Sequence, residues 1–257
     1  MISPLAHIDP GAQLGEGVTV EPFAKIYGDV VIGEGTWIGA GAVIYDGARI
    51  GRNCRIFNGA SISAIPQDMK FSGEETTLEI GDNTTVREFA TLNRGTRAKG
   101  RTVIGRNNLL MAYVHVAHDC ILGDNVIMVA SSGIAGEVEM GDWVTLGGGT
   151  VVHQFVRIGN HAFVGGGAKV RMDVPPYIKA DREPLAYMGI NSVGLERRGF
   201  AREKIRELHE IYRAYYNMGM NGSQALEYIA STLEPTPERD YILQFIKSSQ
   251  RGVIRGR

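Results

Sequence analysis

The chain of 257 residues is poor in cysteine, in net charge and in long apolar runs. Its formal net charge is −1, so no overall field attracts nucleic acid or an anionic membrane. No apolar run reaches the ~18 residues that a membrane-spanning helix needs. The N-terminus also lacks the basic-then-apolar pattern of a signal peptide. We therefore expect no nucleic-acid partner, no integral membrane association and no secretion.

The sequence does have an aliphatic residue or Met at nearly every sixth position. The series runs from Ile8 to Val170, and only Asp68, Glu74 and Ala98 interrupt it. A period of six fits neither a helix, whose period is about 3.6, nor an ordinary two-sided strand. It is typical of hexapeptide-repeat solenoids, in which three hexads make one coil. We predict an all-β solenoid, a three-sided parallel β-helix of about nine coils and about 45 Å.

The fifth position of each hexad holds a small residue, and both cysteines, Cys54 and Cys120, occupy it. We expect this position to face inward near a corner of the coil. The cysteines are then buried, reduced thiols that act as small hydrophobic residues. Reduced thiols indicate a cytoplasmic protein.

Two segments lose the repeat and then resume it in phase. Residues 63–79 carry Pro, Gly and charge, and residues 97–103 are basic and contain Gly. A solenoid that continues in register after an insertion has an external loop there, and such loops often carry function.

Toward the C-terminus the apolar residues take the spacing of an amphipathic helix. Ile205, Leu208 and Tyr212 would lie on one face of such a helix. The prolines after Val174 should stop the strand ladder. We predict a β-helix over 1–190 and a helical domain over 191–257 that caps its open end. Asn221-Gly222 should end one helix, Ser223 should cap the next, and Thr236-Pro237 should open the last.

Coil geometry places residues 18 apart on top of one another. His118, Gly136 and Gln154 form one column, Asp119 and Glu137 begin the next, and His153 lies on the other side. His115 precedes His118 in the same coil. This patch gathers three of the six histidines of the chain.

Three interpretations of this patch are open. The histidines could be merely solvated, or they could bind zinc, as in hexapeptide-repeat carbonic anhydrases. Tetrahedral zinc needs ligands that converge at about 2.1 Å, whereas His118 and His153 are expected in different columns and coils. Asp119 beside His118 fits an oriented general base better, because a carboxylate fixes the imidazole tautomer. We therefore expect no bound metal.

The segment 115–120 (HVAHDC) resembles the signature of the UDP-N-acetylglucosamine O-acyltransferases, which catalyse the first step of lipid A synthesis. Further segments resemble that family in the same order along nearly the whole chain: 67–74 (QDMKFSGE), 94–96 (RGT), 108–111 (NLLM), 152–155 (VHQF), 173–177 (DVPPY) and 197–200 (RRGF). The resemblance implies a left-handed parallel β-helix of hexapeptide repeats with a C-terminal α-helical domain. It also implies a homotrimer with active sites between subunits.

The implied reaction moves an R-3-hydroxyacyl chain from acyl carrier protein to the 3-hydroxyl of UDP-N-acetylglucosamine, without a further cofactor. His118 matches the general base of the family, Asp119 the residue that orients it, and the Gly136 N–H the oxyanion donor. The positions that match substrate contacts are Gln67, Asp68, Lys70, His115, Glu137, His153, Gln154, Asn191 and Arg197. Gly166 matches the position that helps to set acyl length, where Gly suggests an open groove.

Two residues depart from the family pattern. Glu137 stands where the family often has His, and an ionised carboxylate cannot donate a hydrogen bond. Ala201 stands where a capping Ser is common, which should weaken that helix cap by about 1 kcal/mol.

The helical tail is locally basic, and acyl carrier proteins are strongly acidic. We expect Arg198, Arg202 and Lys204 to dock the carrier protein. Interleaved glutamates leave open the alternative of ordinary solvated helix faces. The main alternative function is that of another hexapeptide-repeat acyltransferase that acts on a nucleotide sugar. The related N-acyltransferase normally has a uridine-binding domain before its repeats. The hexads here begin by Ile8, which argues against that enzyme.

Overall fold

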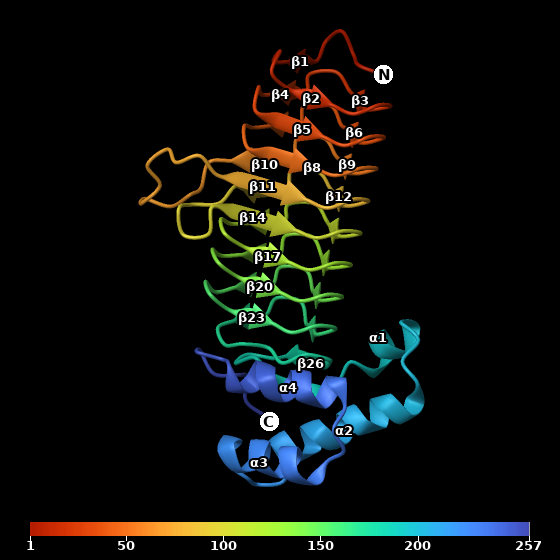
Figure 1. Cartoon of the computed structure of the whole chain (residues 1–257), viewed down its shortest axis with the longest axis vertical. Coiled ribbons are helices and arrows are strands. Elements are labelled where there is room, and N and C mark those ends of the chain that lie inside the picture. The colour runs from red at the N-terminus through yellow and green to blue at the C-terminus, as the bar shows by residue number, and fades with distance from the viewer. Residues whose placement is uncertain (257) are drawn as a thin grey trace.

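The computed structural model describes residues 1–256, and its short parallel strands stack into a long prism with helices at one end (Figure 1). The strands form three sheets, which we number in the order in which the chain first enters them. Among residues 1–256, sheet 1 has nine strands, sheet 2 has eight and sheet 3 has ten. The three faces confirm the β-helix that the period of six predicts.

The strand bounds follow the hexads. Sheet 1 contains β1 (His7–Ile8), β4 (Lys25–Ile26), β7 (Val43–Ile44), β10 (Ser61–Ala64), β13 (Thr91–Asn93), β16 (His115–Val116), β19 (Gly133–Ile134), β22 (Val151–Val152) and β25 (Lys169–Val170). Sheet 2 contains β2 (Gln13–Leu14), β5 (Val30–Ile32), β8 (Ala48–Ile50), β11 (Thr77–Ile80), β14 (Arg101–Ile104), β17 (Ile121–Leu122), β20 (Glu139–Met140) and β23 (Arg157–Ile158). Sheet 3 contains β3 (Thr19–Val20), β6 (Trp37–Ile38), β9 (Arg55–Ile56), β12 (Thr85–Val86), β15 (Leu109–Leu110), β18 (Ile127–Met128), β21 (Thr145–Leu146), β24 (Phe163–Val164), β26 (Ile178–Asp181) and β27 (Ala186–Ile190).

The core runs along the axis of the prism and consists of the first and fifth residues of the hexads. Ile44 and Ile62 at first positions and Ala42 and Ala60 at fifth positions are fully buried. Burying one such aliphatic side chain contributes about 1.5–3 kcal/mol. The stacked first positions therefore stabilise every coil against its two neighbours.

Two loops leave the prism on one side, at the corner where the chain passes from sheet 1 to sheet 2 (Figure 1). We call residues 65–76 the first loop and residues 94–100 the second loop. The first loop is shorter than the expected 63–79, and the second has the expected length but begins three residues before the expected 97–103. Both loops end early because Leu78 and Thr102 are buried fifth-position residues that already belong to β11 and β14. The loops add two hexads and one hexad, since Ser61 pairs with Thr91 and Thr91 with His115.

The strand ladder continues beyond the prolines, contrary to the expectation. Val174 makes an isolated parallel bridge to Ile158 because its own N–H is still available to the Arg157 carbonyl. β26 then joins sheet 3 in parallel with β24, and β27 adds an antiparallel strand. The sequence analysis missed this hairpin.

Up to residue 256, four helices follow: α1 (Ser192–Arg197), α2 (Arg202–Asn217), α3 (Gly222–Thr232) and α4 (Pro237–Lys247). Ile205, Leu208 and Tyr212 of α2 are buried, and the Tyr212 hydroxyl donates to the Pro176 carbonyl at 2.7 Å. These contacts fix the helices over the end of the prism (Figure 1). The division at residue 190 stays a prediction, and it falls between β27 and α1.

The helix caps differ partly from the expectation. α2 ends at Asn217, and Asn221, rather than Ser223, caps α3 in a reciprocal capping box with Gln224. Thr236 caps α4, as expected. Ala201 precedes α2 without a side-chain hydrogen bond. None of the helices among residues 1–256 is long and apolar enough to cross a membrane.

Candidate active site

The predicted column lies at the corner between sheets 1 and 2. His118 follows β16, Gly136 follows β19 and Gln154 follows β22. The Glu137 N–H donates to the His118 carbonyl at 3.0 Å, and the Phe155 N–H donates to the Gly136 carbonyl at 3.2 Å. Adjacent coils are therefore locked together at this corner, and the candidate site rests on a rigid backbone.

His118 and Asp119 form a hydrogen-bonded pair, with His118 Nδ1 and Asp119 Oδ2 2.8 Å apart. The Asp119 side chain is fully buried, whereas 12% of the His118 side chain is exposed. A carboxylate at Nδ1 holds the proton on that nitrogen and leaves Nε2 as the acceptor. Asp68 from the first loop faces Nε2, with its Oδ2 4.0 Å away.

The second loop donates hydrogen bonds to the Asp119 carboxylate. The sequence analysis did not predict this role for the loop. Thr96 donates its N–H to Oδ1 at 3.0 Å and its hydroxyl to Oδ2 at 2.6 Å. The Lys99 N–H also donates to Oδ1 at 3.2 Å, and Thr102 accepts the Asp119 N–H at 2.8 Å. The only sequence signal was the RGT run at 94–96 just before an insertion.

Gly136 lies against the imidazole of His118. A Cβ at residue 136 would be 2.5 Å from Cε1 and 2.6 Å from Nε2 of that ring, closer than real Cβ atoms come. Among residues 1–256, the Gly136 N–H donates to no protein acceptor. A backbone donor beside a general base can stabilise the oxyanion of an acyl transfer.

The remaining predicted residues at this corner surround the pair. Gln67 and Lys70 are exposed on the first loop, and His153 is exposed beside Gln154, with its Nδ1 3.2 Å from Arg251 Nη2. His115 points outward from sheet 1, and its Nδ1 lies 2.7 Å from the Thr91 hydroxyl. Burial lowers the pKa of His115, which favours its neutral form.

Glu137 occupies the corner one coil beyond Asp119. Its carboxylate lines an open cleft of about 280 Å³ together with Lys99, Arg157 and Arg251. Glu139 and Asp173 line the same cleft, so its charge is mixed around the residue that replaces the histidine often found in the family.

Other predicted residues lie elsewhere in the chain. Asn191, Arg197 and Arg198 line a cleft of about 470 Å³ on sheet 3 and α1. Asn191 caps α1, and Arg198 lies over the Trp143 ring, 5.1 Å from its centroid. α1 projects from the side of the prism opposite the two loops (Figure 1). Gly166 is exposed at the corner between sheets 3 and 1. One chain therefore does not bring these residues to His118.

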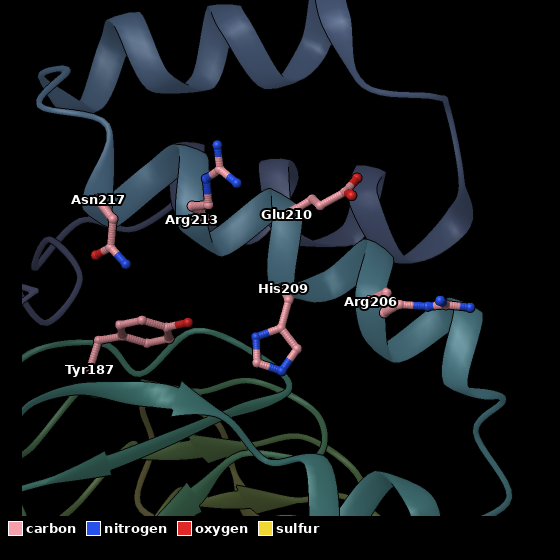
Figure 2. A pocket seen from close by; sticks show the side chains of 6 residues that line it. All are labelled: Tyr187, Arg206, His209, Glu210, Arg213 and Asn217. Carbon is pink, nitrogen blue, oxygen red and sulfur yellow. The ribbon is translucent and has the colours of Figure 1, made fainter.

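The expected docking residues differ in their surroundings. Arg202 is exposed, whereas Lys204 pairs with Glu207 at 2.9 Å and Glu238 at 2.8 Å. A groove of about 400 Å³ lies along the same helix, α2, and Figure 2 shows the side chains that line it: Tyr187, Arg206, His209, Glu210, Arg213 and Asn217. The exposed positive charge of α2 thus extends beyond Arg202.

Both cysteines lie inside the prism, as the repeat predicts. Cys54 and Cys120 are buried, and burial raises the pKa of Cys120 to about 12. A buried thiol of this kind is a poor nucleophile. No group of three or more His, Cys, Asp or Glu side chains among residues 1–256 has the arrangement of a metal site.

The fold and this corner define a hexapeptide-repeat transferase. A bacterial transferase hexapeptide model matches residues 29–64 and 101–136, and a UDP N-acetylglucosamine O-acyltransferase domain 2 model matches 173–254. The chain is 52% identical to the acyl-[acyl-carrier-protein]–UDP-N-acetylglucosamine O-acyltransferase of Chlorobaculum parvum, over 98% of this chain and 96% of that protein. A UDP-N-acetylglucosamine acyltransferase structure from Bacteroides fragilis superposes with a TM-score of 0.97 at 50% identity, covering 99% of this chain and 100% of that one. The Francisella novicida acyltransferase structure gives 0.96 at 37% identity, covering 99% and 94%.

The chain belongs to the family of acyl-[acyl-carrier-protein]–UDP-N-acetylglucosamine O-acyltransferases. The resemblance deduced from its motifs is confirmed, and so is the left-handed parallel β-helix with C-terminal helices.

Proposed function

We propose that this chain transfers an R-3-hydroxyacyl group from acyl carrier protein to the 3-hydroxyl of UDP-N-acetylglucosamine, in lipid A biosynthesis in the cytoplasm. The observation that carries the proposal is the His118–Asp119 pair, 2.8 Å apart, beside the Gly136 backbone. General-base catalysis of this kind is typically worth about 10²–10⁴-fold in rate.

Each residue of this group has one role. His118 Nε2 takes the proton of the sugar hydroxyl as its oxygen attacks the thioester carbon, and Asp119 stabilises the imidazolium that forms. The Gly136 N–H donates to the oxyanion of the tetrahedral intermediate. The C–S bond then breaks, and His118 returns the proton to the departing sulfur. The thioester of the carrier protein supplies the acyl group, so the reaction needs no additional cofactor and no metal.

The residues around Nε2 bind the acceptor. Asp68 is close enough to orient a sugar hydroxyl at His118, and Lys70 and Gln67 extend from the same loop toward solvent. His115, His153 and Gln154 continue the surface along the corner. Glu137 accepts hydrogen bonds here, where a histidine could donate them.

The chain acts as a homotrimer with active sites between subunits. The support is the separation within one chain of the His118 corner from Asn191, Arg197 and Gly166. Two copies of the prism side by side can present both surfaces to one nucleotide sugar. The neighbouring copy then supplies Arg197 to the nucleotide sugar, and Gly166 leaves the end of the acyl groove open.

The C-terminal helices receive the acidic carrier protein. Arg202 is exposed for this contact. Arg198 is half-buried against Trp143 and Lys204 is paired with Glu207 and Glu238, so both are less available to a partner. Rim charges of this kind mainly increase the association rate at low salt.

The test is an assay with purified protein, UDP-N-acetylglucosamine and R-3-hydroxyacyl carrier proteins of several chain lengths. Mass spectrometry should detect an O-acylated nucleotide sugar, and its mass gives the preferred chain. His118→Ala should lower kcat at least about a hundredfold without unfolding the protein. Folded wild-type protein that gives no product with any chain length would refute the proposal.

A further inference from the structure

The second loop, residues 94–100, contributes most of the hydrogen bonds that hold Asp119. Oδ2 receives the Thr96 hydroxyl at 2.6 Å besides His118 Nδ1, and Oδ1 receives the N–H groups of Thr96 and Lys99 at 3.0 and 3.2 Å. Three of the four contacts to this carboxylate therefore come from the loop.

A fully buried carboxylate needs such partners. Without them the carboxylate has no substitute for the hydration that it loses on burial, and the side chain is also free to rotate. Hydrogen bonds to a charged oxygen are shorter and stronger than neutral ones. The four contacts replace the hydration that the buried Asp119 carboxylate has lost and fix the direction in which Oδ2 faces the imidazole.

Glu137 shows that the coil alone does not achieve this. Asp119 and Glu137 occupy the same corner position in successive coils, and both have a φ of 60°. No insertion accompanies the coil of Glu137, and its carboxylate lines an open cleft. The second loop and the shorter Asp side chain are the structural differences between a buried, four-contact carboxylate and one that lines a cleft.

The second loop is itself held on both sides. Lys99 Nζ pairs with Glu139 Oε1 at 3.0 Å on sheet 2. Toward the first loop, Arg97 donates its N–H to Glu74 Oε1 at 3.2 Å and its Nη2 to the Ser72 hydroxyl at 2.9 Å. The first loop carries Asp68, the other carboxylate that faces His118.

We propose that the second loop is the positioning element of the His118–Asp119 pair, and that Thr96 is its principal positioning residue. Thr96 touches no reacting atom and acts through Asp119 on the tautomer and orientation of His118. The kinetic part of this inference rests on the proposed function.

The kinetic test compares Thr96→Val, Thr96→Ser and the control Thr150→Val. Thr96→Val removes one hydroxyl at nearly constant volume and should lower kcat about tenfold to a hundredfold, as losses of orienting partners do. KM should stay within about twofold, and Thr96→Ser should restore most of the rate because it keeps the donor. Thr150 is also a buried threonine, and its hydroxyl donates to the Gly165 carbonyl at 2.8 Å, away from Asp119. Thr150→Val should therefore keep kcat.

A second measurement does not depend on turnover. ¹⁵N-histidine spectra, assigned with His118→Ala, should show the Nδ1–H tautomer of His118 in the wild type and a mixture of tautomers in Thr96→Val. In an Asp119→Asn background, adding Thr96→Val should lower kcat little further, because both substitutions act through the same carboxylate.

A wild-type tautomer in Thr96→Val, a normal kcat, or equal losses in Thr150→Val would each overturn the positioning role. An inactive wild type with the expected tautomer spectra would instead count against the proposed function and leave the positioning role supported.

Discussion

Replacing Gly136 by alanine tests the candidate site most directly. The added methyl group would lie 2.5 Å from Cε1 and 2.6 Å from Nε2 of His118, so one group has to move. The backbone on both sides resists, because the Glu137 N–H binds the His118 carbonyl and the Phe155 N–H binds the Gly136 carbonyl. The imidazole is the more mobile group, and we expect it to turn away from Asp119.

The structure gives two magnitudes for Gly136→Ala. Overpacking of this kind costs about 1–3 kcal/mol of folding stability. For a chain of this size, about 2–4 °C per kcal/mol converts that cost into a Tm lower by roughly 2–12 °C. Loss of an aligned general base should lower kcat at least about a hundredfold. The effect on activity is therefore much larger than the effect on folding.

The measurement is kcat of the acyl transfer beside a thermal melt. Gly148→Ala is the matched control: Gly148 is also the third residue of its hexad, and a Cβ there would meet its nearest atom, the Ala130 carbonyl oxygen, at 3.3 Å. We expect nearly normal kcat for the control. A normal kcat in Gly136→Ala would refute the argument that residue 136 must be Gly to leave room for the imidazole. An equal loss of kcat in Gly148→Ala would show that the close packing on His118 is not the cause of the loss.

Two further predictions concern stability. Burial lowers the pKa of His161 to about 4, below its ordinary value of 6.5. As the pH falls, the unfolded chain therefore binds a proton at residue 161 before the folded chain does, and the folded state loses stability between pH 6.5 and 4. Because the ring is partly exposed, we expect a loss of only roughly 1–2 kcal/mol. Urea titrations at several pH values should show that the free energy of unfolding falls less steeply with decreasing pH in His161→Phe than in the wild type. An equally steep fall in both proteins would count against His161 as the cause. Asn221→Ala should cost about 1 kcal/mol in chemical denaturation through loss of the α3 cap, and an equal loss in Ser223→Ala would contradict the assignment of the cap to Asn221.

The sequence predicts those parts of the site that share the 18-residue repeat. His118 and Gly136 differ by one coil, so the period alone places them together. Thr96 and Asp119 differ by 23 residues across an insertion, and the repeat has no information on how an inserted loop folds back. Asn221 illustrates a local limit, because Asn221 and Ser223 are both good capping residues, and only the reciprocal contact with Gln224 decides between them.

The rigid prism also determines how a complete site can form. Every coil from residue 7 to residue 170 is hydrogen-bonded to its neighbours, so no hinge can carry Arg197 around to the His118 corner. A nucleotide sugar that needs both surfaces therefore has to bind between two copies. If the proposed trimer forms, His118→Ala and Arg197→Ala should each be nearly inactive. Mixed trimers made by co-refolding equal amounts should regain activity at about a quarter of their sites, where each copy supplies the residue that the other lacks. Mixing without refolding serves as the control. If co-refolded trimers stay inactive while each variant alone folds and assembles, the two surfaces do not form one site.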